Sequence, residues 1–266
     1  MILSILEMVC PVVLMFLLGR LCSKKQIFSP QGLAAGFLLR RFLEPHGRFL
    51  PFLVTNFEGG MMGYALFGLL YPGQTHVFAM ADIGQTLAAF TVFLTALQAV
   101  SSGKADFKAL MKNAVRNPVL IAIVLGVVLG AAGVGQKALD SAAGKLIGDT
   151  IGFIAAPVSG LILIIVGYEL SFKKALLRPV VVTVALRLAV TAALLGLGSL
   201  IIFAVIPFDK QLFTALMLAW SLPAPFIIPL YADLKEDGEY VSTCLSAMTV
   251  VSILMFIGVA AYSLAG

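Results

Sequence analysis

Three prolines lie close together in an apolar segment near the end of the chain, residues 220–229. Each proline removes a backbone donor and its ring clashes with the preceding turn, so a helix cannot run unbroken through Pro223, Pro225 and Pro229. Inside hydrocarbon, the carbonyl groups freed by such a break find partners only where protein or a water-filled cavity covers them. The segment therefore predicts two half-helices joined by a covered, non-helical break.

A second apolar segment contains a break built from glycine instead of proline. Residues 56–63 read Asn-Phe-Glu-Gly-Gly-Met-Met-Gly within the apolar stretch 49–71. Two interrupted apolar segments, one in each half of a chain, are the sequence pattern that points to the binding site of a secondary transporter.

The composition favours an all-α polytopic membrane protein. The chain is 61% hydrophobic and only 12% charged, against roughly 25% charged residues in an ordinary soluble domain. Apolar runs of about 20 residues, each long enough to cross a bilayer core, recur along the chain. The expected spans are residues 2–22, 49–71, 77–100, 118–134, 150–169, 179–206, 211–232 and 240–264.

The distribution of basic residues predicts the orientation of these eight spans. With the N-terminus outside, fourteen Lys and Arg residues fall on the inner side and only three on the outer side. The positive-inside rule then places both termini outside. Because the net charge of +5 arises from these loops, it does not indicate nucleic acid as a partner. The three cysteines, Cys10, Cys22 and Cys244, indicate neither a disulfide framework nor a metal site.

Two short matches indicate an internal repeat. Residues 10–19 match residues 117–126, and residues 87–92 match residues 245–250, in the same order and on either side of the two breaks. The sequence thus predicts a first, incomplete repeat over residues 1–100, a cytoplasmic amphipathic linker over 101–116, and a second repeat of five helices over 117–266. Short interfacial helices are expected at residues 104–112 and 139–146.

The two matches also differ in their offset along the chain. The first pair is offset by 107 residues and the second by 158, so the first repeat is shorter than the second by about 51 residues. We expect ten spans in two five-helix repeats, of which this chain lacks most of two. A natural eight-span protein with a short re-entrant segment is the alternative. A five-helix unit places its second copy upside down in the membrane, which gives an inverted repeat.

The residues around both breaks resemble the auxin efflux carrier family. The resemblance rests on residues 55–64 and 70–73, on residues 223–253, on Asn117 and Pro118 at the start of a span, and on Arg187 inside another. It implies an inverted five-helix repeat like that of bile-acid symporters and sodium/proton antiporters, with two crossing broken helices. It also implies a permease for small organic acids in the bacterial inner membrane, and it matches Asn56 to a residue that contacts the substrate carboxylate.

The predicted substrate site surrounds the two breaks. The second half-helices are expected to begin near residues 59–63 and 225–228, and their free N–H groups and dipoles favour an anion. Asn56 and Ser221 flank the breaks as possible direct donors or, alternatively, as interhelical hydrogen-bonding groups. The predicted substrate-binding residues are Asn56, Glu58, Gly59, Gly60, Ser221, Pro223 and Pro225.

Two charged residues inside the spans are candidates for coupling or charge pairing. A carboxylate at Glu58 is costly to ionise at that depth, which suits a proton-coupling role, but Glu58 can equally cap the N–H groups of Gly60 and Met61. Arg187 has three candidate partners: Glu169, a carbonyl exposed by a break, or the substrate.

The predicted function is a secondary transporter that moves a small organic anion, such as a carboxylate, by alternating access. A channel and a non-transporting membrane sensor or scaffold are the alternatives. An intramembrane enzyme is disfavoured because the chain has no His/Glu metal spacing, no GxSxG and no paired Asp in a span. No organic cofactor is expected. Coupling to H⁺ or Na⁺ and a homodimeric state are left open, and the lipid bilayer is the expected surrounding.

Overall fold

The computed structural model describes residues 46–102, 118–134, 140–155 and 173–265, together with a few isolated residues between these ranges. Within them the chain forms helices and no strand, as the composition predicts. The expected span 2–22, the linker helix 104–112, the matching segment 10–19 and Glu169 lie outside the described residues.

Both predicted breaks are present. The first broken helix consists of α3 (Leu50–Leu53), a non-helical stretch over residues 54–58, the π-helix η3 (Gly59–Gly63) and α4 (Tyr64–Leu70). The second consists of α13 (Lys210–Ser221), a mostly non-helical stretch over residues 222–227 and α14 (Ile228–Tyr231). The second half-helices thus begin where the glycine and proline positions predict.

Each broken helix is followed by a long helix. After the first come α5 (Thr75–Ala88), the π-helix η4 (Ala89–Phe93) and α6 (Leu94–Ser102), which together form one continuous helical stretch. After the second comes α15 (Gly238–Leu264). The order of a broken helix and then a long helix therefore occurs twice in the described part of the chain. Short 3-10 turns occupy His46–Arg48, Lys174–Leu176 and Lys235–Asp237.

Two helical stretches are long and apolar enough to cross a membrane. They are α12 (Leu177–Val205) and residues 235–264, and both stand out among the described residues by length and composition. Two shorter apolar helices cover Gly59–Leu70 and Leu120–Ala131. Neither broken helix is long enough to count as a membrane-spanning helix, because each is divided into two shorter helices. The total of eight spans stays a prediction.

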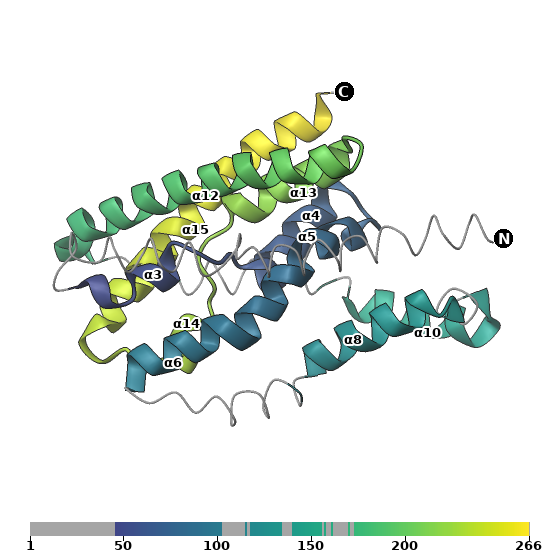
Figure 1. Ribbon diagram of the computed structural model, residues 1–266, viewed down its shortest axis with the longest axis horizontal. Helices are drawn as coiled ribbons and strands as arrows, with labels where there is room; N and C mark the ends of the chain where they lie inside the picture. The colour runs from purple at the N-terminus through teal and green to yellow at the C-terminus, as the bar shows by residue number, and fades with distance from the viewer. Residues whose placement is uncertain are drawn as a thin grey trace.

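Helices α8 (Pro118–Ala131) and α10 (Ala142–Ala155) lie apart from the main bundle (Figure 1). Both expose apolar side chains. The separate interfacial helix predicted over residues 139–146 is wrong, because α10 runs from Ala142 past residue 150 without interruption. No proline falls between residues 139 and 156 to end the helix earlier. Most of the predicted span 150–169 beyond α10 lies outside the described residues.

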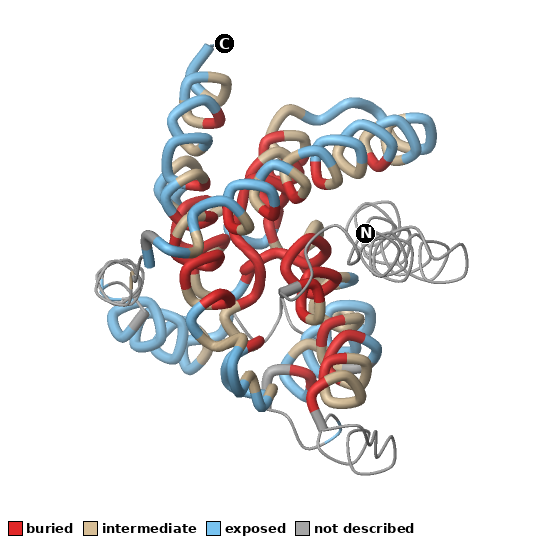
Figure 2. The backbone as a smooth tube through the Cα atoms, turned by 90° about the vertical axis from the view of Figure 1, so that its left-hand side faces the viewer, coloured by how far each residue is buried: buried red, intermediate tan, exposed pale blue. Residues whose placement is uncertain are grey.

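Two large apolar clusters form most of the core in the described part of the chain, beside a small one of Leu50 and Val54. The first joins α3, α6, α14 and the starts of α12 and α15, and the second joins η3, α4, α5, α13 and the end of α15, with the later part of α12 packed against it. Each broken helix contributes one half to each cluster, and α3 shares its cluster with α14 while α4 shares its cluster with α13. The two broken helices therefore run in opposite directions. Buried residues gather at the centre of the bundle (Figure 2).

Candidate functional site

The two breaks meet at Glu58 and Pro223. The backbone N–H of Glu58 donates a hydrogen bond of 2.9 Å to the carbonyl oxygen of Pro223. Pro223 lies two residues after the end of α13, and Glu58 is the residue immediately before η3. The non-helical stretches of both broken helices, residues 54–58 and 222–227, are therefore in direct contact. We call this place the crossing.

The side chain of Glu58 joins the same two stretches a second time. Its Oε1 accepts a hydrogen bond of 3.1 Å from the N–H of Met61, and its Oε2 accepts one of 2.7 Å from the N–H of Phe226. Glu58 is only 6% exposed. The capping role predicted for Glu58 is confirmed at Met61, while its second partner comes from the other break and not from Gly60.

Arg187 of α12 is bound to carbonyl groups that the breaks leave without helical partners. Its guanidinium donates to Leu53 at 2.8 Å, to Asn56 at 2.9 Å and to Leu222 at 2.8 Å. Of the three partners predicted for Arg187, the structure thus has the exposed carbonyls. A guanidinium suits this position because its several N–H groups can reach carbonyls on different segments at once.

Asn56 and Ser221 lie at the crossing as predicted, and both are buried. The hydroxyl of Ser221 donates to the carbonyl of Leu218 at 2.7 Å, one turn earlier in α13. The carbonyl of Ser221 accepts a hydrogen bond of 2.6 Å from the hydroxyl of Ser252 on α15. In this conformation Ser221 therefore binds its own helix and anchors α15.

The remaining predicted site residues also lie in the breaks. Gly59 is buried, Gly60 is exposed, and Pro223 and Pro225 are buried. The carbonyl of Pro225 accepts a hydrogen bond from the N–H of Ile228 at 3.2 Å, which begins the turn into α14. The structure therefore brings all seven predicted substrate-binding residues into the two non-helical stretches and their immediate ends.

A second buried carboxyl group at this place, Asp82 of α5, was not among the predicted site residues. Asp82 is 4% exposed. Its oxygens accept hydrogen bonds from Tyr64 at 3.3 Å, from Gln85 at 3.2 Å and from Thr86 at 2.9 Å. The spacing of Asp82, Gln85 and Thr86 places them on one face of a helix. That polar face inside an otherwise apolar span was the signal available in the sequence.

The crossing is chemically suited to hold a carboxylate. Two N–H groups, one from each broken helix, converge on one carboxylate group, that of Glu58. Hydrogen bonds from backbone N–H groups to an ionised acceptor are stronger than those between neutral groups. The described residues contain no group of three or more His, Cys, Asp and Glu side chains placed to hold a metal ion.

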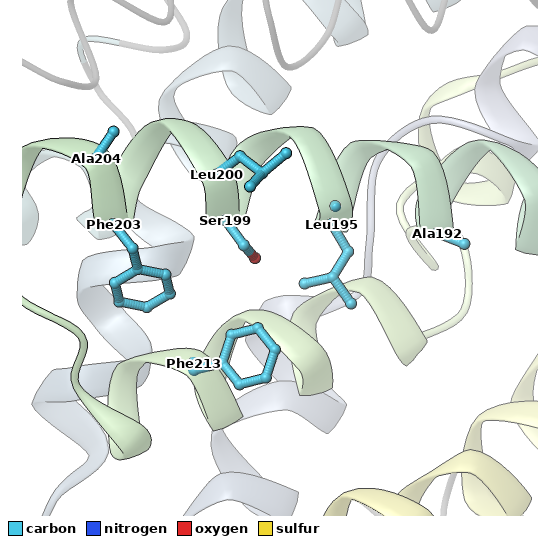
Figure 3. A pocket seen from close by; sticks show the side chains of 8 residues that line it. Ala192, Leu195, Ser199, Leu200, Phe203, Ala204 and Phe213 are labelled. Atoms are coloured by element: carbon cyan, nitrogen blue, oxygen red, sulfur yellow. The ribbon is translucent and has the colours of Figure 1, made fainter.

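A separate apolar groove lies on α12 and α13, away from the crossing (Figure 3). Its volume is about 670 Å³. One face of α12 and the ring of Phe213 line it, and Ser199 is the one hydroxyl among the lining residues. None of the predicted site residues takes part in this groove.

No protein-family model, curated protein or solved structure matches the chain.

Proposed function

We propose that the chain is a multi-pass integral membrane protein that transports a small organic anion by alternating access, with the anion bound where the two broken helices cross. One observation carries this proposal. Backbone N–H groups from both broken helices converge on a single carboxylate, so the crossing has the donors that a substrate carboxylate needs.

The opposite directions of the broken helices support the transporter fold. The halves of the two helices pack crosswise, first half with second half, in two clusters that the polar crossing separates. Inverted-repeat transporters place their substrate between such half-helices at the middle of the membrane. The resemblance of residues 55–64 and 223–253 to the auxin efflux carrier family agrees with this arrangement. A member of that family in the bacterial inner membrane is our proposal for the class.

Proton coupling is the role that we propose for Glu58. The ionised side chain accepts both converging N–H groups, so a substrate carboxylate competes for the same donors. A neutral Glu58 is a poorer acceptor and gives up the two N–H groups more easily. Binding of the anion would then accompany uptake of a proton. Coupling to Na⁺ is the alternative, and anion uptake that requires sodium would favour it.

Counterflow in proteoliposomes tests the transport function. Purified protein is reconstituted and loaded with a panel of unlabelled monocarboxylates and dicarboxylates, and the entry of each labelled anion is measured. We expect saturable uptake that an internal pool of the same anion accelerates. Flux without saturation or counterflow would favour a channel. The absence of both uptake and ligand-dependent thermal stabilisation would favour a sensor or scaffold.

A matched pair of variants links the transport to the crossing. Asn56→Ala removes a buried side chain at the crossing, whereas Ser199→Ala changes the separate groove on α12. We expect Asn56→Ala to weaken uptake and Ser199→Ala to leave it unchanged. Equal effects of the two substitutions would place the site elsewhere.

A further inference from the structure

The carboxyl group of Asp82 connects α5 to the first break through two routes. Directly, Oδ2 accepts a hydrogen bond of 3.3 Å from the hydroxyl of Tyr64, the first residue of α4. Indirectly, Gln85 donates to Oδ1 of Asp82 at 3.2 Å and to the carbonyl of Phe57 at 2.9 Å. Thr86 completes the set with a bond of 2.9 Å from the same helix. One carboxyl group thus bonds the half-helix Gly59–Leu70 to α5, in addition to the apolar packing between them.

Gly59 brings this carboxyl group into close contact with the break. A Cβ atom at Gly59 would lie 2.3 Å from Oδ1 of Asp82, so only glycine leaves room for the side chain there. Gly59 begins the helical part that follows the break. Asp82 therefore lies against the first turn of the half-helix as well as against Tyr64.

The charged and titratable groups around Asp82 are few. Helix α5 packs against η3, α4, η4 and α13. From the first broken helix, Glu58 interacts electrostatically with Asp82, and Tyr64 donates to it. Helix α13 has its one titratable residue, Lys210, at its first position, and η4 has none. Within the described ranges no Lys, Arg or His forms an ion pair with Asp82.

We propose that Asp82 is a positioning residue whose protonation releases the half-helix Gly59–Leu70 from α5. An ionised carboxylate that is buried without a cation depends on its hydrogen-bond donors, so it holds Tyr64 and Gln85 firmly. A neutral carboxyl group has fewer acceptor sites and forms weaker bonds to them. The contact of the first break with α5 is therefore tight at high pH and loosens as the pH falls.

The role of this switch in a transport cycle rests on the proposed function, whereas the pH-dependent movement does not. Glu58 binds the N–H groups of Met61 and Phe226 at the crossing, and Asp82 acts from α5 through Tyr64 and Gln85. Asp82 thus determines the position of the half-helix Gly59–Leu70, while Glu58 determines whether the N–H groups of Met61 and Phe226 are free to bind an anion.

The chain contains a natural reporter for this movement. Trp220 is the one tryptophan in the sequence, and its ring meets that of Phe57 edge-on, with 5.6 Å between centroids. The carbonyl of Phe57 accepts the bond from Gln85. In the full chain, purified in detergent, we expect the emission of Trp220 to shift to longer wavelength in a step as the pH falls.

Four variants identify the residue whose protonation causes the emission step. Asp82→Asn is expected to abolish it, because the amide cannot ionise. Tyr64→Phe is expected to move it to higher pH, because the ionised form loses a donor. Glu58→Gln is expected to retain the step, because Asp82 still ionises in that variant. Ser199→Ala, in the groove on α12, is the control and is expected to leave the step unchanged.

Several results would overturn the proposal: a wild-type emission that does not change with pH, a step that persists in Asp82→Asn, or a step that disappears entirely in Glu58→Gln. If Asp82→Asn does not fold, Tyr64→Phe serves as the test instead. An unchanged midpoint of the emission step in Tyr64→Phe would then contradict the proposal.

Counterflow at several pH values separates this proposal from the transport function. Transport with the same pH profile in Asp82→Asn and wild type would remove Asp82 from the cycle and leave the transport function intact. If the protein shows the Asp82-dependent step but transports none of the anions, the pH-dependent movement stands and the transport function is wrong.

Discussion

Glu58 donates its backbone N–H to the carbonyl oxygen of Pro223 at 2.9 Å, so the residue that precedes the half-helix Gly59–Leu70 is bonded to the second break. This single contact joins two segments that are far apart in the sequence. It is reinforced by the side chain of Glu58 on Phe226 and by Arg187, which bonds to carbonyls of both segments. The crossing is therefore formed by three segments, the two breaks and α12, whose hydrogen-bond donors and acceptors pair with one another.

Arg187 is expected to be essential for the stability of the crossing. Replacement by Ala leaves the carbonyls of Leu53, Asn56 and Leu222 without their donor in a buried place. Hydrogen bonds to a charged group contribute about 1.5–3 kcal/mol each, so we expect a loss of at least about 3 kcal/mol in the free energy of unfolding. Denaturant unfolding in detergent micelles measures this loss.

Arg178 is the matched control for this experiment, since it is an exposed arginine near the start of the same helix. Arg178→Ala should change the free energy of unfolding by less than about 0.5 kcal/mol. Equal stabilities of the two variants would contradict the role of Arg187.

Two glycines should respond in opposite ways to the same substitution. Gly59→Ala places a Cβ atom 2.3 Å from Asp82, and the resulting overpacking is expected to cost about 1–3 kcal/mol. Gly84→Ala, in the interior of α5 with nothing within 4 Å, is expected to stabilise the protein by about 0.5–1 kcal/mol. Thermal unfolding of both variants checks the prediction. A Gly59→Ala variant as stable as wild type would show that Asp82 is not held against the half-helix.

Glu58 is expected to contribute part of the pH dependence of anion uptake. Glu58→Gln keeps the shape of the side chain but cannot ionise, and it has one acceptor oxygen for the two N–H groups of Met61 and Phe226. We therefore expect uptake that loses the part of its pH response due to Glu58 and keeps the part that depends on Asp82. Initial rates in proteoliposomes at several pH values measure this response.

Glu239 offers the comparison for Glu58, because it is an exposed carboxylate that pairs with Lys173 at 3.0 Å. Glu239→Gln should have the pH profile of the wild type. Full pH-dependent uptake in Glu58→Gln would exclude the coupling role.

The orientation of α12 can be tested by labelling from either side of the membrane. Its 29 residues span roughly 43 Å, more than the apolar core of about 30 Å. In a cysteine-free background, Lys173→Cys should react only from the cytoplasmic side and Phe208→Cys only from the other side. Both positions are exposed. Labelling of both from the same side would show that α12 does not cross the membrane.

The breaks were the part of the fold that the sequence predicted best. Proline and glycine act on the backbone locally, so Pro223, Pro225 and the glycines at 59, 60 and 63 predict where helices stop without knowledge of their neighbours. The boundaries of the half-helices accordingly lie at Gly59 and Ile228. The length of α10 was not predicted, because an amphipathic pattern and an apolar pattern can follow one another in a single helix and no proline separates them here.

The partners of the polar residues depend on contacts between distant segments. The sequence indicated that Arg187 needed acceptors, but it left Glu169, the carbonyls and a substrate as alternatives. Asp82 was missed because one acid in an apolar span has no local signature beyond its spacing to Gln85 and Thr86. Its importance follows from its contact with Gly59, which is formed only when α5 packs against the first broken helix.

The division of the interior into two clusters has a mechanical consequence. Each broken helix has one half in each cluster, and Phe226 packs against both. Displacement of one cluster relative to the other bends the two broken helices most easily at residues 54–58 and 222–227, where helical hydrogen bonds are missing, whereas α15 joins both clusters as one continuous helix. The points where the two broken helices bend most easily and the candidate site are thus the same residues, so a ligand bound there would also stiffen both broken helices.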